Sequence, residues 1–283
     1  MSVAFRIIPR LDIKGPNLVK GMHLEGLRVL GKPEDFAKYY YENGADELIY
    51  QDVVASLYGR NSLHEIITKT AKEIFIPLTV GGGIKTLENI SDILRSGADK
   101  VCINTAAVND PEFISRASKM FGASTIVLAI EVIIQENGEY MAFTENGRNA
   151  TDRNAISWAI EGQKLGAGEI LITSVDNEGT GCGIDTELMS QVTDEVSIPV
   201  IAHGGIGDKS DVLELKKSNN ISGVAIASMF HYDFITFNRS LDGYDEEGNT
   251  EFLKSNRVVS NINPSTIKKL KKYLSSNGIN SRL

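Results

Sequence analysis

The sequence predicts a closed parallel (β/α)₈ barrel assembled from two similar half-barrels. Short β-branched runs alternate with amphipathic stretches along all 283 residues, which is typical of parallel strands joined by helices. Three segments also recur about 122 residues later in the chain: GGGI (81–84) as GGIG (204–207), GADELI (44–49) as GAGEIL (166–171), and VCINT (101–105) as VAIAS (224–228). Three matches at one offset indicate a duplication. A twofold repeat of four βα units closes naturally as a barrel, and this favours the barrel over an open doubly wound sheet.

Each predicted strand is a short apolar run, and each predicted helix has apolar residues at helical spacing. The strands are expected at residues 5–10, 46–51, 76–80, 100–104, 125–131, 169–174, 198–202 and 223–227. The helices are expected at residues 33–43, 62–73, 86–96, 111–121, 155–165, 185–196, 208–217 and 264–277. Pro264 suits the first turn of the last helix, where no N–H donor is needed. One domain is expected over residues 1–283, with half-barrels at about 1–122 and 123–283.

Composition narrows the function classes. A formal net charge of −8 argues against a nucleic-acid surface, which needs a high local density of cations. Cys102 and Cys182 are too few for a disulfide framework and lack metal-ligand spacing. No apolar run has transmembrane length, and the first residues lack a signal-peptide core. We expect a cytoplasmic protein with no metal, no cofactor and no membrane or nucleic-acid partner.

Two long segments follow strands, at residues 12–31 after the first strand and at 233–263 after the eighth. In a barrel, both positions lie at the face that carries catalysis. Segments of this length inside a compact domain usually mean function, an added interface or disorder.

Glycines at the strand ends predict two anion sites at the mouth of the barrel. Backbone N–H groups of such glycines can approach a phosphate, and the dipole of the following helix adds positive charge. The first candidate cup combines Gly82, Gly83, Asn104 and Thr105. Its repeat-related counterpart combines Gly179, Gly204, Gly205, Ala227 and Ser228. Tight turns explain either cup alone equally well, whereas two equivalent cups favour a ligand with a phosphate at each end.

Two carboxylates end the first strand of each half, Asp12 and Glu131. Facing each other across the mouth, they can divide general-acid and general-base duties if their environments separate their pKa values. The alternative for Glu131 is a solvent-facing position in a hairpin. Lys20, in the first long segment, is a candidate cation over a phosphate, although most lysines of a surface loop have no such role.

Other reactive side chains have simpler explanations. His203 and His231 follow strands, but with no third ligand nearby a structural role is favoured over metal binding for both. Cys182 has no adjacent base. Trp158 lies at helical spacing with apolar neighbours, which predicts a core position.

Several of these segments together resemble the HisF family, the cyclase subunits of imidazole glycerol phosphate synthase. The resemblance runs from Arg6 to about Tyr232 and resumes in the final helix. Its specific pieces are LDIK (11–14), VKG (19–21), GADEL (44–48), PLTVGGGI (77–84), GADKV (97–101), GAGEIL (166–171) and FHY (230–232).

The resemblance implies a two-part reaction. A HisH-like glutaminase partner hydrolyses glutamine, and ammonia crosses the barrel to a ribonucleotide precursor with a phosphate at each end. Ammonia adds at the ribulosyl carbonyl, the imidazole ring of imidazole glycerol phosphate closes, and aminoimidazole carboxamide ribonucleotide leaves. By this resemblance Asp12 and Glu131 carry acid/base catalysis, and Lys20 belongs to a mobile loop over the substrate. Thr173 and Asp176 match residues near the reacting centre and the second phosphate. The implied ammonia entrance is a charged ring of Arg6, Glu47, Lys100 and Glu169, with Asp99 at the glutaminase contact.

The chain departs from the family pattern at the mouth. Glu131 replaces an aspartate, Arg10 a cysteine, and His203 a small hydroxyl residue, while Asn177 and Glu178 stand for Arg-Asp. Residues 233–263 also make the segment after the eighth strand longer than usual. The departures leave two alternatives open: a HisF-like paralogue delivering ammonia for amidino groups on surface sugars, or a non-catalytic scaffold for the glutaminase.

Overall fold

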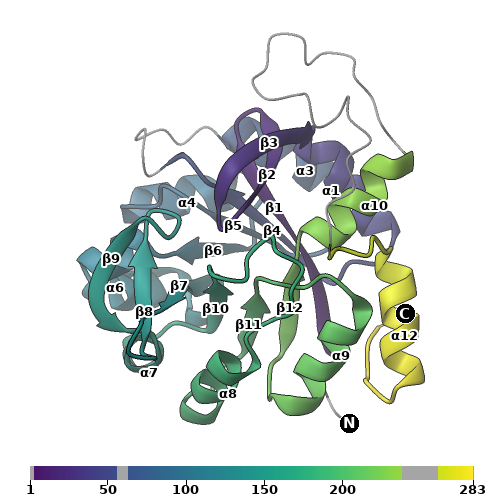
Figure 1. Cartoon of the computed structure of the whole chain (residues 1–283). Coiled ribbons are helices and arrows are strands. Elements are labelled where there is room, and N and C mark those ends of the chain that lie inside the picture. The colour runs from purple at the N-terminus through teal and green to yellow at the C-terminus, as the bar shows by residue number, and fades with distance from the viewer. Residues whose placement is uncertain (1–2, 56–62, 238–260, 283) are drawn as a thin grey trace.

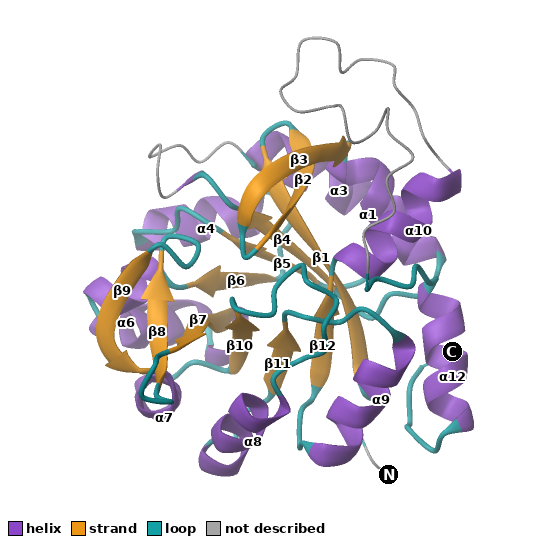
Figure 2. Ribbon diagram, viewed as in Figure 1, coloured by secondary structure: helices purple, strands orange, loops and turns teal. Residues whose placement is uncertain are grey.

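Eight parallel strands close into a barrel, as the sequence predicts. The computed structural model describes residues 3–55, 63–237 and 261–282. Each strand pairs in parallel with the next, and the last pairs with the first, so the ring is complete (Figures 1 and 2). In ring order the strands are β1 (Arg6–Lys14), β4 (Leu48–Asp52), β5 (Leu78–Gly81), β6 (Lys100–Ile103), β7 (Ile126–Ile134), β10 (Glu169–Ser174), β11 (Val200–His203) and β12 (Gly223–Ile226).

Helices surround the barrel on its outer face (Figure 2). They are α1 (Pro33–Glu42), α3 (His64–Glu73), α4 (Leu87–Arg95), α5 (Thr105–Asn109), α6 (Glu112–Phe121), α7 (Ala155–Leu165), α8 (Thr186–Glu195), α9 (Lys209–Ser218), α10 (Ser228–Phe237) and α12 (Ile267–Ser276), with a 3₁₀ turn, η1, at Ala123–Thr125. Both glycine clusters lead into a helix with a capping box, Thr86 with Asn89 in α4 and Asp208 with Asp211 in α9. Each box satisfies backbone N–H groups that the first turn leaves free. The two halves therefore start the corresponding helix in the same way.

Two hairpins extend the first strand of each half beyond its predicted end. Residues 12–31 continue β1 and then form β2 (Asn17–Met22) and β3 (Glu25–Gly31). In the second half, β7 continues to Ile134 and pairs with β8 (Tyr140–Thr144), which pairs with β9 (Asn149–Asn154). Figure 1 shows these hairpins on different sides of the barrel mouth. The hairpins place residues that do not belong to the barrel core at the mouth of the barrel.

The hydrophobic core has two layers, one inside the barrel and one between strands and helices. The inner layer is a small column of apolar side chains: Ile8, Ile49, Cys102, Val127, Leu171, Ile201 and Ala225, with Ala129 beside them. Trp158 is buried in the outer layer, as its spacing predicts. Apolar side chains therefore fill most of the barrel centre, and the charged side chains lie at its two ends.

The second long segment is described only at its ends. Residues 233–237 form the end of α10, and residues 261–263 precede α12, whereas residues 238–260 lie outside the described part of the chain. Across the residues that the structure describes, no helix combines the length and apolarity needed to cross a membrane.

Candidate active site

Asp12 and Glu131 both lie at the mouth of the barrel, on strands β1 and β7. Arg10, also on β1, links this area together: its Nε donates to Asp12 Oδ1 at 2.9 Å and its Nη1 to Thr173 Oγ1 at 3.2 Å. All four side chains are buried. Glu131 is not the solvent-facing hairpin residue of the alternative reading, because its Oε2 accepts the Gly147 N–H at 2.9 Å.

The surroundings separate the pKa values of the two carboxyl groups. Burial alone would raise the pKa of Asp12, but the Arg10 guanidinium and the Lys20 ammonium outweigh it and hold the pKa below its usual range. Burial also raises the pKa of Glu131, and there the Gly147 N–H and the charge of Arg10 offset it only in part. Asp12 is thus suited to act as a base, and Glu131 is the better proton donor.

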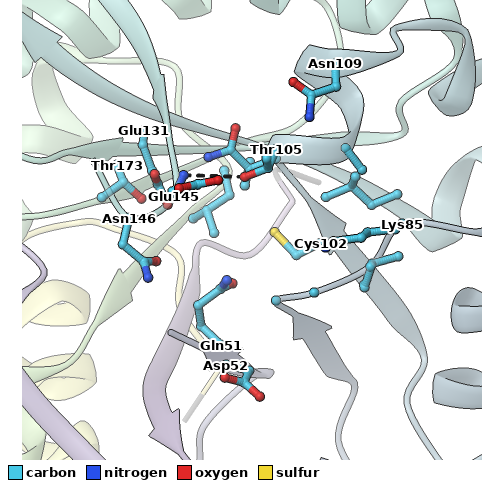
Figure 3. Close-up of a pocket in the computed structure, with 18 of the residues that line it drawn as sticks. Gln51, Asp52, Lys85, Cys102, Thr105, Asn109, Glu131, Glu145, Asn146 and Thr173 are labelled. Carbon is cyan, nitrogen blue, oxygen red and sulfur yellow. Dashed lines mark hydrogen bonds between the residues drawn. The ribbon is translucent and has the colours of Figure 1, made fainter. Parts of the chain in front are cut away.

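The first cup opens into a cavity of about 270 Å³ that also reaches Glu131, Thr173 and Arg10. All four residues predicted for this cup line it, and Figure 3 shows Thr105, Glu131 and Thr173 gathered on one side with Gln51 and Asp52 opposite. A Cβ at Gly82 would lie 2.3 Å from the carbonyl oxygen of Asp52, at a φ of +101°. Only glycine fits that turn, which leaves room for a ligand beside Glu131; Asp12 is reached from this cavity through its partner Arg10.

The turn between β8 and β9 closes part of this cavity. Asn146 donates from Nδ2 to the Val53 carbonyl, and the Glu145 N–H donates to Thr105 Oγ1 at 3.4 Å, the dashed line in Figure 3. Neither residue was predicted from the sequence, and nor was Lys85 in the cavity wall. The signal for the turn was an Asn-Gly pair at 146–147, a strong hairpin indicator between two strands.

The second cup is far smaller. All five residues predicted for it line a hollow of about 10 Å³, together with Glu178, His203, Ile206, Ala225 and Ile226. That volume is about the room for one water molecule. The two cups are therefore related by the repeat but unequal in this structure.

A buried ion pair holds the β2–β3 hairpin beside the second cup. Lys20 Nζ contacts Glu178 Oε1 and donates to the Gly21 carbonyl at 3.1 Å. Glu178 also accepts the Leu24 N–H on Oε2 at 3.0 Å, and its carbonyl accepts the His23 N–H at 2.9 Å. Lys20 thus lies beside the second cup, and a carboxylate holds it there.

The structure does not bring Asp176 into either cup. Its side chain is exposed, and Oδ2 accepts the Ile134 N–H at the end of β7 at 2.9 Å. Glu178, two residues later, takes the inward position. His231 is fully buried, with Nδ1 2.6 Å from the Tyr40 hydroxyl, as its structural interpretation suggests.

At the opposite end of the barrel, four charged side chains form a closed ring of ion pairs. Arg6 contacts Glu47 at 2.7 Å and Glu169 at 2.5 Å, and Lys100 contacts the same two carboxylates at 3.1 and 3.0 Å. Between this ring and Arg10 lies the apolar column, where burial raises the pKa of the Cys102 thiol to about 12. The groups between the two ends are therefore uncharged, which suits passage of a small neutral molecule.

Comparison with known proteins identifies the relatives of this barrel. A family model described as "Histidine biosynthesis protein" matches residues 6–236. A protein of Legionella pneumophila named imidazole glycerol phosphate synthase subunit HisF is 57% identical over 202 residues, which cover 71% of this chain and 95% of that protein. Proteins with the same name from Bifidobacterium adolescentis and Methanopyrus kandleri are 44% and 41% identical over 256 and 266 residues, in each case 88% of this chain, and 99% and 98% of their own length.

The chain belongs to the HisF family. Four of the mouth residues singled out from the sequence, Arg10, Glu131, Glu178 and His203, influence one another electrostatically. Arg10 pairs with Asp12, not with Glu131, and its charge also acts on His203 and Glu131. Glu178 holds Lys20, while His203 lines the second cup. These four side chains therefore form one connected group around Asp12.

The face with the ion-pair ring also carries an exposed apolar residue. Phe75 is 81% exposed and lines a hollow of about 390 Å³ with Pro77 and Asp99. Asp99 itself is exposed, and its Oδ2 accepts the Leu78 N–H at 2.8 Å. Exposed aromatic side chains are enriched in protein–protein contacts.

Proposed function

We propose that this chain is the cyclase subunit of imidazole glycerol phosphate synthase and works in the cytoplasm with a HisH-like glutaminase. The observation that carries the proposal is the acid/base pair, Asp12 and Glu131, at one end of an apolar barrel whose other end is a charged ring. We also propose that residues 1–283 form one domain of two half-barrels, supported by the matching hairpins and capping boxes.

The glutaminase would dock on the ring face, with Phe75 and Asp99 in the contact. Ammonia released there would pass Arg6, Glu47, Lys100 and Glu169 and then travel through the apolar column as the neutral molecule. The column favours NH₃ over NH₄⁺ because an unpaired cation among apolar side chains loses its hydration.

At the mouth, the precursor would lie with one phosphate in the first cup and its reacting carbonyl near Thr173. Ammonia adds to the carbonyl carbon, Glu131 protonates the resulting oxygen, and Asp12 takes the proton that the new nitrogen loses. Loss of water and ring closure then give imidazole glycerol phosphate and release aminoimidazole carboxamide ribonucleotide. Proton transfers of this kind contribute about 10²- to 10⁴-fold to rate.

The test is turnover of the precursor by the isolated subunit with ammonium salt at high pH, where free ammonia is abundant. Asp12→Asn should abolish this activity, because the amide cannot accept the proton. An unchanged rate in Asp12→Asn would remove Asp12 from the mechanism, and a non-catalytic scaffold would show no turnover at all.

A second candidate is ammonia delivery for amidino groups on surface sugars. The specific observation in its favour is the second cup, which is small and faces a carboxylate, Glu178, together with His203. If this candidate is correct, the protein would turn over a sugar acceptor with ammonia and would leave the bis-phosphate precursor unchanged.

A further inference from the structure

His203 lines the second cup and holds a buried hydrogen-bond acceptor. Its Nδ1 lies 3.0 Å from the carbonyl oxygen of Ala225, and since a carbonyl only accepts, Nδ1 carries the proton. In the neutral ring Nε2 then has a lone pair. Nε2 has no hydrogen-bond partner among the residues that the structure describes, and the side chain is 3% exposed.

The cup has room for about one water molecule in this structure, so it would have to widen to admit a phosphate, whose oxygens would then approach that lone pair. The cup is formed by Gly204, Gly205 and Ser228 at the start of α10, with His203 in its wall. A phosphate oxygen and an unprotonated ring nitrogen both accept and repel each other. A proton on Nε2 converts the contact into a charge-assisted hydrogen bond, one of the stronger kinds in proteins.

We propose that phosphate binding in the second cup takes up one proton at His203, which makes this residue the determinant of how that end of the ligand is held. The proposal rests on the proposed function for the identity of the ligand and goes beyond it in assigning His203 a role.

Burial and the charge of Arg10 keep the His203 ring neutral until the ligand arrives. Burial is the largest effect, and with the Arg10 guanidinium on β1 it lowers the pKa of His203 to about 4. Asp12 on β1 and Glu178 in the loop after β10 act in the opposite direction. His231 on α10 also lies within electrostatic range. The two carboxylates do not suffice to protonate the ring, and a bound phosphate adds further negative charge beside it.

The sign of the pH effect follows from linkage. The complex holds one proton more than the free protein, so affinity falls as pH rises from the free pKa toward the bound pKa, by about tenfold per pH unit. The phosphate itself ionises near pH 6, and this favours binding as pH rises. Above about pH 7, where the ligand is fully ionised, the His203 contribution stands alone.

Ring-nitrogen NMR of the full chain tests the proposal, and with only four histidines in the sequence the spectrum is simple. The wild-type protein is titrated with the bis-phosphate precursor at pH 7.5, without ammonia or glutaminase. His203→Ser, which restores a small hydroxyl, assigns the signal. His203→Gln is the matched control, because its amide donates without taking up a proton.

The expected result is a neutral His203 ring in the free protein and an imidazolium in the complex. Binding to wild type should weaken from pH 7 to 8, and binding to His203→Gln should not. Precursor binding with a neutral His203 overturns the inference and leaves the proposed function standing. Absence of precursor binding sinks the proposed function, and inorganic phosphate then decides: conversion of His203 to the imidazolium supports the inference, and an unchanged ring at the highest phosphate concentration overturns it.

Discussion

The buried ion pair between Lys20 and Glu178 should hold the β2–β3 hairpin in place beside the second cup. Glu178→Gln removes the charge but keeps an acceptor for the Leu24 N–H. Lys20 is 2% exposed, so it would keep a buried ammonium without its carboxylate. Removing one partner of a buried pair typically costs about 3–5 kcal/mol.

The hairpin can avoid most of that cost by opening, because Lys20 then regains its hydration. We therefore expect the loss mainly in local stability. At about 1.4 kcal/mol per factor of ten, amide protection in residues 17–31 should fall by roughly two to four orders of magnitude. Protection in the barrel strands should change little.

Hydrogen exchange read by mass spectrometry measures this directly. Lys20→Met and the double variant Lys20→Met/Glu178→Gln complete a mutant cycle, and the double variant should recover most of the protection because neither charge is left alone. If amide protection of residues 17–31 is the same in Glu178→Gln as in wild type, the ion pair does not hold the hairpin.

The pH dependence of the hairpin has a definite sign. Burial would raise the pKa of Glu178, but Lys20 outweighs it and lowers the pKa below 4.5, so the stabilisation is lost as pH falls through that lower value. Burial would lower the pKa of Lys20, but Glu178 and Asp12 raise it above 10.5, so the stabilisation is lost as pH rises through that higher value. Hairpin protection, corrected for intrinsic exchange, should be constant from about pH 5 to 10.

Three further predictions concern the acid, the ring and the first cup. Glu131→Gln should lower ammonia-driven turnover by about 10²- to 10⁴-fold with the fold intact, as read by single-turnover kinetics and circular dichroism; a full rate would place the acid elsewhere. Lys100→Met should lower the yield of product per glutamine hydrolysed in the glutaminase complex, because Glu47 and Glu169 lose one of their two shared cations; an unchanged yield would separate the ring from ammonia transfer. Gly82→Ala should lower thermal stability more than Gly44→Ala, since both have positive φ but only Gly82 meets a carbonyl, at 2.3 Å; equal losses would contradict the close approach.

The barrel could be predicted because its cause is local and repeated. Strand and helix periods alternate along the chain, and the glycine clusters mark the same turn in both halves. The hairpins were harder to predict, because residues 12–31 carry neither a long apolar run nor a clear period. Their pairing depends on β1 and β7 continuing past the barrel, which is a tertiary effect.

The site could be predicted only as far as strand ends dictate it. Asp12, Glu131 and the first cup follow from the ends of strands that share one mouth. The partner of Arg10 and the inward turn of Glu178 in place of Asp176 depend on side-chain packing across β1, β10 and the hairpin. Sequence spacing carries no information on such contacts.

The central claim is that Asp12 serves as the base in an ammonia-dependent cyclisation at this barrel mouth. Its most direct test is turnover of the bis-phosphate precursor by the isolated subunit with ammonium salt at high pH, wild type beside Asp12→Asn. We predict formation of imidazole glycerol phosphate by wild type and none by the variant. A wild-type protein that binds the precursor and leaves it unchanged would contradict the account.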